Sequence, residues 1–126
     1  MDLEKVMETE QDFTQELSEV MSLAKRIEAV IGRTVQVKQH TTPHSWGFKA
    51  PKNFAFPLWQ KEKNRLWIQA EKRWADGAGV SESADHADDK GVFGRPAVYW
   101  EVPKSDAERR NRVAYILARV CDARHH

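Results

Sequence analysis

Aromatic and basic residues occur together in the middle of the chain, in the stretch KNFAFPLWQKEKNRLWIQAE from residue 52 to residue 71. Because a β-strand places every second residue on the same face, this stretch predicts a hairpin with a core face and an aromatic, basic face. The binding residues expected on or beside that second face are Lys38, Lys49, Trp59, Lys61, Lys63, Arg65, Trp67 and Tyr99. A β-sheet binds single-stranded nucleic acid through aromatic side chains that stack on the bases and through cationic side chains that pair with the phosphates. The alternative is that the aromatic rings pack under a helix or a long loop, with the basic residues as a solvated rim.

The acidic segment 75–95 offers a second kind of chemistry. Asp85, His86 and Asp88 could ligate a divalent cation through carboxylate oxygen and imidazole nitrogen, and acid-rich metal sites hydrolyse phosphodiesters in nucleases. Their spacing does not match an EF-hand, which needs acids at alternate positions, a glycine and a distal glutamate. The segment therefore supports only a weak hypothesis of a metal-dependent hydrolase. The alternative is a solvated acidic loop, and no cofactor is expected.

Two histidines and the single cysteine carry the other reactive groups. His40 and His44 lie four residues apart on a turn and could join His86 as a general base or metal ligand. Cys121 could be a nucleophile beside one of these histidines, but its position in an apolar helix favours a buried role. No catalytic pattern stands out, so a binding protein is the favoured interpretation and an enzyme the less favoured one.

The hairpin that would present the binding face has a clear alternation of apolar residues. Its turn is polar and ends in Asn64, a residue type that tolerates a positive φ. Pro57 lies inside the first strand and predicts an edge position or a bulge there. The residues expected on the core face are Phe54, Phe56, Leu58, Leu66, Ile68 and Ala70.

The N-terminal segment predicts one long helix. Apolar residues recur at heptad spacing from Leu3 to Ile31, and Gly32 is placed to end the helix. At 1.5 Å per residue such a helix is about 42 Å long, which exceeds what a small sheet can cover. Either only about residues 13–31 pack on the sheet, or the N-terminal half pairs with a partner protein or a second copy. The oligomerisation residues would then be Val6, Phe13 and Leu17.

The remaining elements complete an α+β fold. Strands are expected at 34–40, 45–50 and 97–102, and a helix at 106–123, with Ser105 and Glu108 as a capping box at its start. The prediction is a long N-terminal helix, a mostly antiparallel sheet of four or five strands and a C-terminal helix. Residues 1–126 are expected to form a single domain, in which 1–12 are a helical extension and 75–95 a long acidic, glycine-containing loop.

Several short stretches resemble a bacterial family of unknown function that is described as a predicted transport protein domain. The similar stretches are WGFK at 46–49, KNF at 52–54, QKEKNRL at 60–66 and GRPAVYWEV at 94–102, within a resemblance over about residues 23–121. Domains of this family also occur at the C-termini of larger proteins, some of which resemble restriction or phage-defence components. The resemblance implies the same order of strands and helix and a place in such a system, but no catalytic residues. The acidic loop departs from the family pattern, which is shorter there.

Charge is distributed unevenly along the chain, although its net value is only +1. Residues 1–31 carry eight acids and three bases, whereas residues 38–73 carry eight bases and two acids. We therefore expect separate faces of the molecule to have electrostatic potentials of opposite sign. No apolar run is long enough to span a membrane, and one cysteine excludes an internal disulfide. The sequence therefore predicts a cytoplasmic binding module without membrane association, whose partner is nucleic acid, another protein or a second copy.

Overall fold

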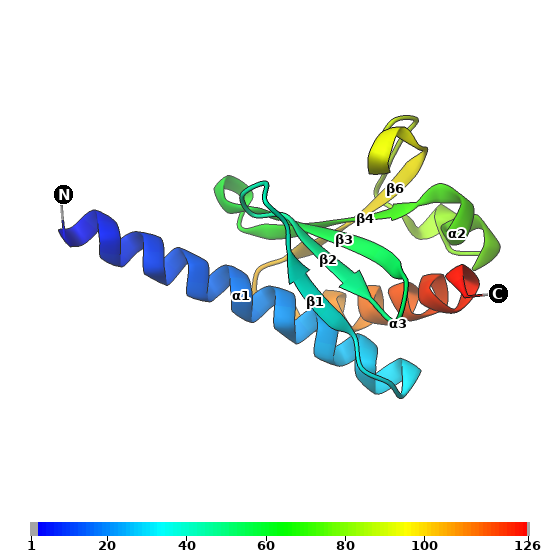
Figure 1. Cartoon of the computed structure of the whole chain (residues 1–126), viewed down its shortest axis with the longest axis horizontal. Helices are drawn as coiled ribbons and strands as arrows, with labels where there is room; N and C mark the ends of the chain where they lie inside the picture. The colour runs from blue at the N-terminus through cyan, green and yellow to red at the C-terminus, as the bar shows by residue number, and fades with distance from the viewer. Residues whose placement is uncertain (1–2, 126) are drawn as a thin grey trace.

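Two long helices lie on one face of a six-stranded antiparallel sheet in the computed structural model of this protein (Figure 1). The structure describes residues 3–125, with side chains described from residue 13 onward. The sheet confirms the predicted α+β layout but has six strands, not four or five, in the order β1-β2-β3-β4-β6-β5. No described helix is both long and apolar enough to cross a membrane. The elements are α1 (Leu3–Ile31), β1 (Gln36–Gln39), β2 (Trp46–Lys49), β3 (Asn53–Gln60), β4 (Arg65–Glu71), α2 (Lys72–Gly77), β5 (His86–Asp88), β6 (Ala97–Pro103) and α3 (Ala107–Arg124).

Helix α1 contributes to the core through its C-terminal half. Val20, Leu23 and Ile27 are fully buried, at the spacing that aligns side chains along one helix face. Gly32 follows with φ 72°, and its N–H donates to the Glu28 carbonyl at 2.8 Å, so the helix ends as predicted. The N-terminal half of α1 extends beyond the sheet (Figure 1).

Strand β4 presents its residues as predicted. Leu66, Ile68 and Ala70 are fully buried under the helices, while Arg65 and Trp67 lie on the opposite face.

Phe54 is buried in the core as predicted, but from Ala55 onward β3 has the opposite phase from the predicted one, which corrects the placement of Trp59. Trp59 pairs with Leu66 and lies in the core at 4% exposure, whereas Phe56 and Leu58 are half-buried on the other face. The cause is a β-bulge near the start of the strand. Phe48 pairs with Ala55 and Lys49 with Asn53, so that one extra residue sits in β3. A bulge shifts the two-residue alternation by one position.

Pro57 does not mark an edge, because β3 is an interior strand between β2 and β4. The ladder between β2 and β3 is interrupted beyond Ala55, and the next pairing is a single bridge between Ser45 and Leu58. Pro57 lies within this interruption. Although proline has no backbone N–H, the ladder between β2 and β3 therefore loses no hydrogen bond at this position.

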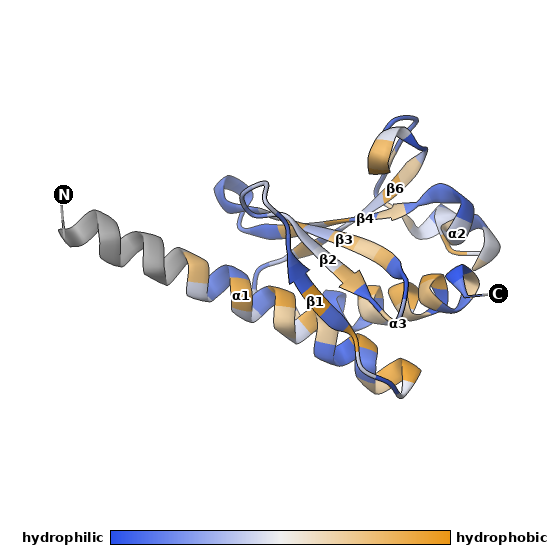
Figure 2. Ribbon diagram, viewed as in Figure 1, coloured by the Kyte–Doolittle hydropathy of each residue, from blue (hydrophilic) through white to orange (hydrophobic). Residues whose placement is uncertain are grey.

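The segment 75–95 is far more regular than the predicted loop. It contains the end of α2, short 3₁₀ turns at Ser81–Ser83 and Val92–Gly94, and strand β5, which supplies the sixth strand by pairing with β6. The segment between β5 and β6 lies against β6 at Gly91, and its tip projects from the sheet and carries an apolar stretch that is orange in Figure 2. Gly91 lies so close to Tyr99 that an added Cβ would be 2.6 Å from the Tyr99 Oη. Only a glycine therefore allows this segment to lie against the sheet.

The start of α3 differs from the predicted capping box. Asp106 is the N-cap residue, and its Oδ1 accepts a hydrogen bond from the Arg109 N–H at 3.0 Å. Ser105 instead has φ 62°, and its N–H donates to Glu19 Oε1 at 3.0 Å. Ser105 therefore precedes the N-cap by one residue, and its backbone contacts α1.

Candidate ligand-binding site on the open face of the sheet

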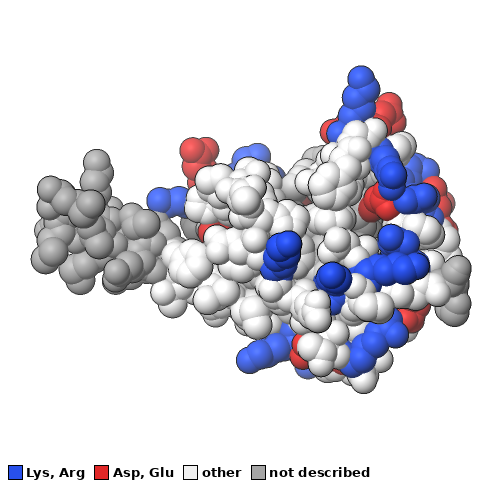
Figure 3. All heavy atoms as spheres, viewed as in Figure 1, with Lys and Arg blue, Asp and Glu red and all other residues white. Residues whose placement is uncertain are grey.

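The face of the sheet turned away from α1 and α3 is called the outer face here. Strand alternation places these residues on it: Lys38, Lys49, Phe56, Leu58, Arg65, Trp67, Gln69, Glu71, Tyr99 and Glu101. In the view of Figure 3, Lys and Arg side chains are spread over a largely uncharged surface, including its middle. Lys38 and Lys49 are exposed on β1 and β2, so the predicted basic component of this face is present.

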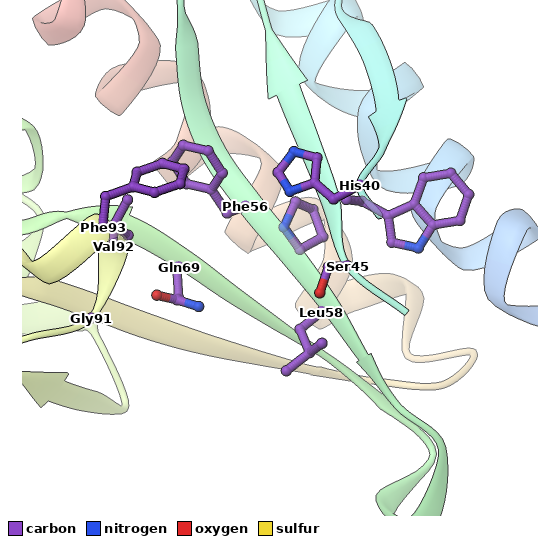
Figure 4. Close-up of a pocket in the computed structure, with 10 residues that line it drawn as sticks. His40, Ser45, Phe56, Leu58, Gln69, Gly91, Val92 and Phe93 are labelled. Carbon is purple, nitrogen blue, oxygen red and sulfur yellow. The ribbon is translucent and has the colours of Figure 1, made fainter. Parts of the chain in front are cut away.

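A hollow of about 210 Å³ opens on the outer face, between β3 and the hairpin that joins β5 to β6. We call it the aromatic pocket. The Phe93 ring lies edge-on to the Phe56 ring, with centroids 5.4 Å apart, and the His40 ring lies 6.3 Å from Phe56 on the other side (Figure 4). The pocket is lined by His40, Ser45, Trp46, Phe56, Pro57, Leu58, Gln69, Gly91, Val92 and Phe93.

The polar atoms of the aromatic pocket come from different strands and turns. Gln69 pairs with Phe56 in the β3–β4 register, and its amide provides both donors and an acceptor. The Ser45 hydroxyl can donate or accept. Apolar walls with a few polar groups are typical of small-ligand sites, so the pocket is suited to a flat ring with polar edges.

Phe93 is unusual in both exposure and backbone conformation. Its side chain is 79% exposed, and its φ of 50° and ψ of 40° are left-handed, which bulky residues rarely adopt. Such a conformation costs on the order of 1–3 kcal/mol and occurs preferentially at ligand clamps and other functional sites. Among the features of the outer face, the exposed ring and strained backbone of Phe93 are those that packing within the chain explains least.

Trp67 and Arg65 lie on the outer face as predicted, but both are engaged. The Arg65 guanidinium lies 4.9 Å from the centroid of the Trp67 ring. It also forms an ion pair with Glu101 at 2.7 Å and donates to Gln60 Oε1 at 2.6 Å. The Trp67 ring also contacts His86 and Tyr99, at 4.7 and 5.1 Å between centroids. The residue is half-buried, so Trp67 forms part of a packed cluster rather than a free stacking platform.

Tyr99 lies on the outer face but is only 8% exposed, because the segment around Gly91 covers it. Burial and the neighbouring Asp88 carboxylate raise the pKa of its hydroxyl above the ordinary value. Lys61 and Lys63 are exposed on the 3₁₀ turn between β3 and β4, at one end of the sheet. Of the predicted binding residues, Trp59 lies in the core between the sheet and the helices, and Tyr99 is buried in a smaller hydrophobic cluster with Val92 and Ala97.

The acidic residues proposed as metal ligands are used for structural contacts. Asp85 Oδ2 accepts from the Glu101 N–H at 2.8 Å and pairs with Arg109 at 2.6 Å, while Asp88 accepts from the Lys90 N–H at 3.1 Å. Within the part of the chain that the structure describes, no three His, Cys, Asp or Glu residues are placed to hold a metal ion. Strands β5 and β1 are opposite edges of the sheet, so His86 does not meet His40.

Cys121 is fully buried in α3. Burial raises the pKa of its thiol, although the Arg33 guanidinium, 3.4 Å from Sγ, acts in the other direction. The nearby histidine is His125, with Nδ1 3.9 Å from Sγ, and neither His40 nor His44 contacts the thiol. A buried, protonated thiol is a poor nucleophile, so the arrangement fits a packing role.

Comparison of the chain with family models, curated proteins and solved structures finds no match. The family resemblance described above therefore stays a prediction, and the geometry of the outer face is the basis on which a function can be proposed.

Strand alternation and composition do not predict the pocket residues Phe56 and Phe93. The bulge in β3 reverses the face on which Phe56 was expected, and Phe93 falls in the segment that was predicted to be an irregular loop. One signal could have pointed to Phe93: an apolar aromatic residue between Gly91 and Gly94, inside an otherwise polar segment.

Proposed function

We propose that this chain is a non-enzymatic module that binds single-stranded nucleic acid on the outer face of its sheet. The observation that carries the proposal is the aromatic pocket with its strained, exposed Phe93. A base that stacks on Phe93 and Phe56 would bring its polar edge to the Gln69 amide. Stacking of one base on an aromatic side chain contributes about 1–3 kcal/mol.

The charges on the outer face support this assignment. Lys49 lies on β2, next to β3, and Lys38 lies on β1, the edge strand beyond it, where both can contact the phosphates of a nucleic-acid strand that crosses the pocket. The acids on this face are largely offset, since Glu101 is paired with Arg65 and Glu71 with Arg95. The face therefore presents aromatic rings beside cations to a polyanion.

The cellular setting that we propose comes from the resemblance predicted from the sequence, to a family whose domains also occur at the C-termini of larger proteins, some of which resemble restriction or phage-defence components. We propose that it acts within an assembly of that type, where it would hold a nucleic-acid strand while another component carries out catalysis.

The test is fluorescence anisotropy of a labelled oligo-dT strand of about ten nucleotides, a length within the range of known single-strand sites. The wild-type chain should bind at low salt and release the strand as salt increases. Phe93→Ala should weaken binding about 5- to 100-fold, the equivalent of removing one base–ring stack.

Tyr115→Ala is the matched control for Phe93→Ala. Tyr115 is also an exposed aromatic residue, at 59% exposure, but it lies on α3, on the other side of the molecule. Its removal should leave the affinity unchanged. The proposal fails if the wild-type chain does not bind the strand at low salt, or if both alanine variants bind as well as the wild type.

A second proposed function is self-association through α1. Phe13 and Leu17 are 43% and 36% exposed where the helix leaves the sheet, although the Phe13 ring also stacks on Trp46 with 6.4 Å between centroids, so part of this apolar seam is open to a partner. The side chain of Val6, the third residue predicted for this contact, lies outside the described residues. A second copy is the proposed occupant, because the acidic N-terminal helix of one copy and the basic segment 38–73 of the other are complementary in charge.

A further inference from the structure

We infer that the aromatic pocket selects adenine and that Gln69 is the residue that recognises the base; this inference rests on the proposed nucleic-acid function. Gln69 lies on β4 in the middle of the outer face. In the sheet register it pairs with Phe56 on β3 and with Tyr99 on β6. Because paired residues lie side by side on the same face of a sheet, its side chain lies beside the Phe56 ring, where a stacked base would present its polar edge.

The Gln69 amide has donors and an acceptor that the chain itself does not use. The side chain is half-buried, and it takes part in no hydrogen bond within the described residues. By contrast, its neighbours two positions further along the same face, Glu71 and Trp67, are engaged with Arg95 and Arg65. Since polar groups that are taken out of water usually have a hydrogen-bond partner, a free amide beside a pocket points to a ligand.

The glycine at position 91 keeps this amide accessible. A Cβ added at Gly91 would be 3.4 Å from Gln69 Oε1, so a larger residue would crowd the amide with its side chain. In the view of Figure 4, Gln69 lies between Gly91 and Ser45, below the rings of Phe56 and Phe93. The amide is thus directed into the pocket beside the rings on which a base would stack.

The lining of the aromatic pocket favours a neutral ring over a charged group. None of the described residues that line it is Asp, Glu, Lys or Arg, and the polar side chains are those of His40, Ser45 and Gln69. Transfer of an unpaired charge from water into such surroundings is costly. The pocket is therefore suited to the base of a nucleotide, while the phosphate groups stay outside it.

The hydrogen-bonding pattern of a glutamine amide favours adenine among the four bases. The amide offers a donor and an acceptor side by side, and glutamine forms a bidentate pair with N6 and N7 of adenine. An unpaired base can present either its Watson–Crick or its Hoogsteen edge. Adenine has an adjacent donor and acceptor on both edges, whereas the Hoogsteen edges of guanine, cytosine and thymine lack this combination. Adenine can therefore pair with Gln69 through either edge.

Ser45 is placed to contact the other end of a two-ring base. It forms a bridge with Leu58 on β3, so Ser45 and Gln69 lie on either side of that strand. Two strand spacings separate their backbones by about 10 Å. A purine extends further across this distance than a one-ring pyrimidine, and a ring nitrogen of adenine that Gln69 does not use can accept from the Ser45 hydroxyl. The pocket thus favours a purine by size and adenine by hydrogen bonding.

The test is fluorescence anisotropy of labelled DNA strands of about ten positions, a length within the range of known single-strand sites, in which every position except a central one is an abasic site. The central position carries adenine, guanine, thymine or purine without an exocyclic group, so a single base can occupy the pocket. The wild-type chain should bind the adenine strand about 5- to 100-fold more tightly than each of the others, as expected for a bidentate pair. Equal or tighter binding of any of the other three strands would overturn the inference.

Gln69→Met assigns the preference to the amide, because methionine keeps a side chain of similar length without the amide group. This variant should bind the adenine strand and the strand with unsubstituted purine equally well. Its affinity for the unsubstituted purine should equal that of the wild type, since stacking holds that base in both proteins. A preference for adenine that survives in Gln69→Met would overturn the role of Gln69.

Gln39→Met is the matched control for Gln69→Met. Gln39 is an exposed glutamine on β1 of the same sheet, and it pairs with Trp46, whose side chain is buried in the core. It therefore lies on the opposite face from the pocket, and its replacement should leave the preference for adenine unchanged. Loss of the preference in both variants would contradict recognition by Gln69.

Failure of this inference can be distinguished from failure of the proposed function. A wild-type chain that binds neither oligo-dT nor any of these strands at low salt refutes the proposed function. Binding of oligo-dT that depends on Phe93, without a preference for adenine, refutes only the recognition of adenine. The comparison of bases in the wild type gives this answer even if Gln69→Met does not fold.

Discussion

Trp59 and Phe93 illustrate how a single residue acquires its role from its surroundings. The sequence predicts a binding role for Trp59, yet this residue is 4% exposed and its N–H supports the turn that carries His44. Phe93 lies in a segment predicted to be a loop, yet it presents a ring that is 79% exposed beside Phe56. Both are aromatic, and only their location in the fold separates a core residue from a candidate ligand contact.

Glu71 is a residue whose ionisation should affect stability. Its carboxylate accepts hydrogen bonds from Trp74 Nε1 at 2.6 Å and from the Arg95 guanidinium at 3.0 Å, and Arg73 adds a third donor. Burial alone would raise the pKa of Glu71, but these hydrogen bonds outweigh it and hold the pKa below the ordinary value of 4.5. Because the pKa of Glu71 is lower in the folded state than in the unfolded state, its carboxylate stabilises the fold at pH values above the unfolded-state pKa. This stabilisation is lost as the pH falls through the folded-state pKa.

Glu71→Gln should therefore lower the free energy of unfolding at neutral pH. The difference from the wild type should shrink as the pH falls below 4.5, because the wild-type carboxylate then becomes protonated as well. Urea denaturation at neutral and acidic pH measures both quantities. Glu82→Gln, at an exposed position on the 3₁₀ turn Ser81–Ser83, is the control and should show little change. A Glu71→Gln difference that is independent of pH would contradict this account.

Among the helices and strands, the start of α3 depends on Asp106 rather than Ser105. Asp106→Ala should lower the free energy of unfolding by about 1 kcal/mol, the typical cost of removing an N-cap. Ser105→Gly is the control and should leave the free energy of unfolding largely unchanged. Glycine adopts the φ of 62° at that position without strain, and the serine side chain does not cap the helix. Chemical denaturation of both variants is the measurement. An equal destabilisation of the two variants would show that the cap has been assigned to the wrong residue.

Strand β5 shows how an element can depend on its partner more than on its own sequence. His86, Ala87 and Asp88 have no apolar alternation, and all three are exposed. They form a strand because β6 offers an open edge, with His86 paired to Tyr99. The glycine at position 91 then lets the chain return across the outer face, which places Phe93 opposite Phe56.

Across the molecule as a whole, the layering of helices and sheet leaves two surfaces open to partners. The helices cover one face of the sheet, so the outer face with its aromatic pocket is accessible to a ligand. The N-terminal half of α1 extends past the sheet and exposes Phe13 and Leu17. The proposed self-association involves α1 and the basic segment 38–73, and this segment also carries Lys38 and Lys49 of the proposed nucleic-acid face. Substitutions on α1 test self-association without changing that face.

Light scattering over a range of protein concentrations tests the proposed self-association. The wild type should be a dimer, and Phe13→Lys/Leu17→Lys should be a monomer, because a charge in an apolar helix contact is strongly unfavourable. Val30→Lys is the control: Val30 is 45% exposed near the other end of α1, so this variant should remain a dimer. A wild-type chain that stays monomeric at all concentrations would rule out the contact.

The elements that the sequence predicts correctly are those whose signals are local. Heptad spacing and Gly32 predict α1 and its end, the alternation of Leu66, Ile68 and Ala70 predicts the core face of β4, and Asn64 marks the turn before it. These features depend on helix and strand periodicity and on backbone preferences of single residues, which act over a few positions.

The features that depend on distant partners emerge only when the chain is folded. The bulge opposite Phe48 reverses the faces of β3, so Trp59 belongs to the core and Phe56 to the aromatic pocket. The pairing of β5 with β6 brings Phe93 over the outer face, and packing of α1 places Glu16 beside His44 across 28 positions of sequence. Each of these contacts joins segments far apart in the chain, and strand register follows from which partners pair rather than from the residues of one strand.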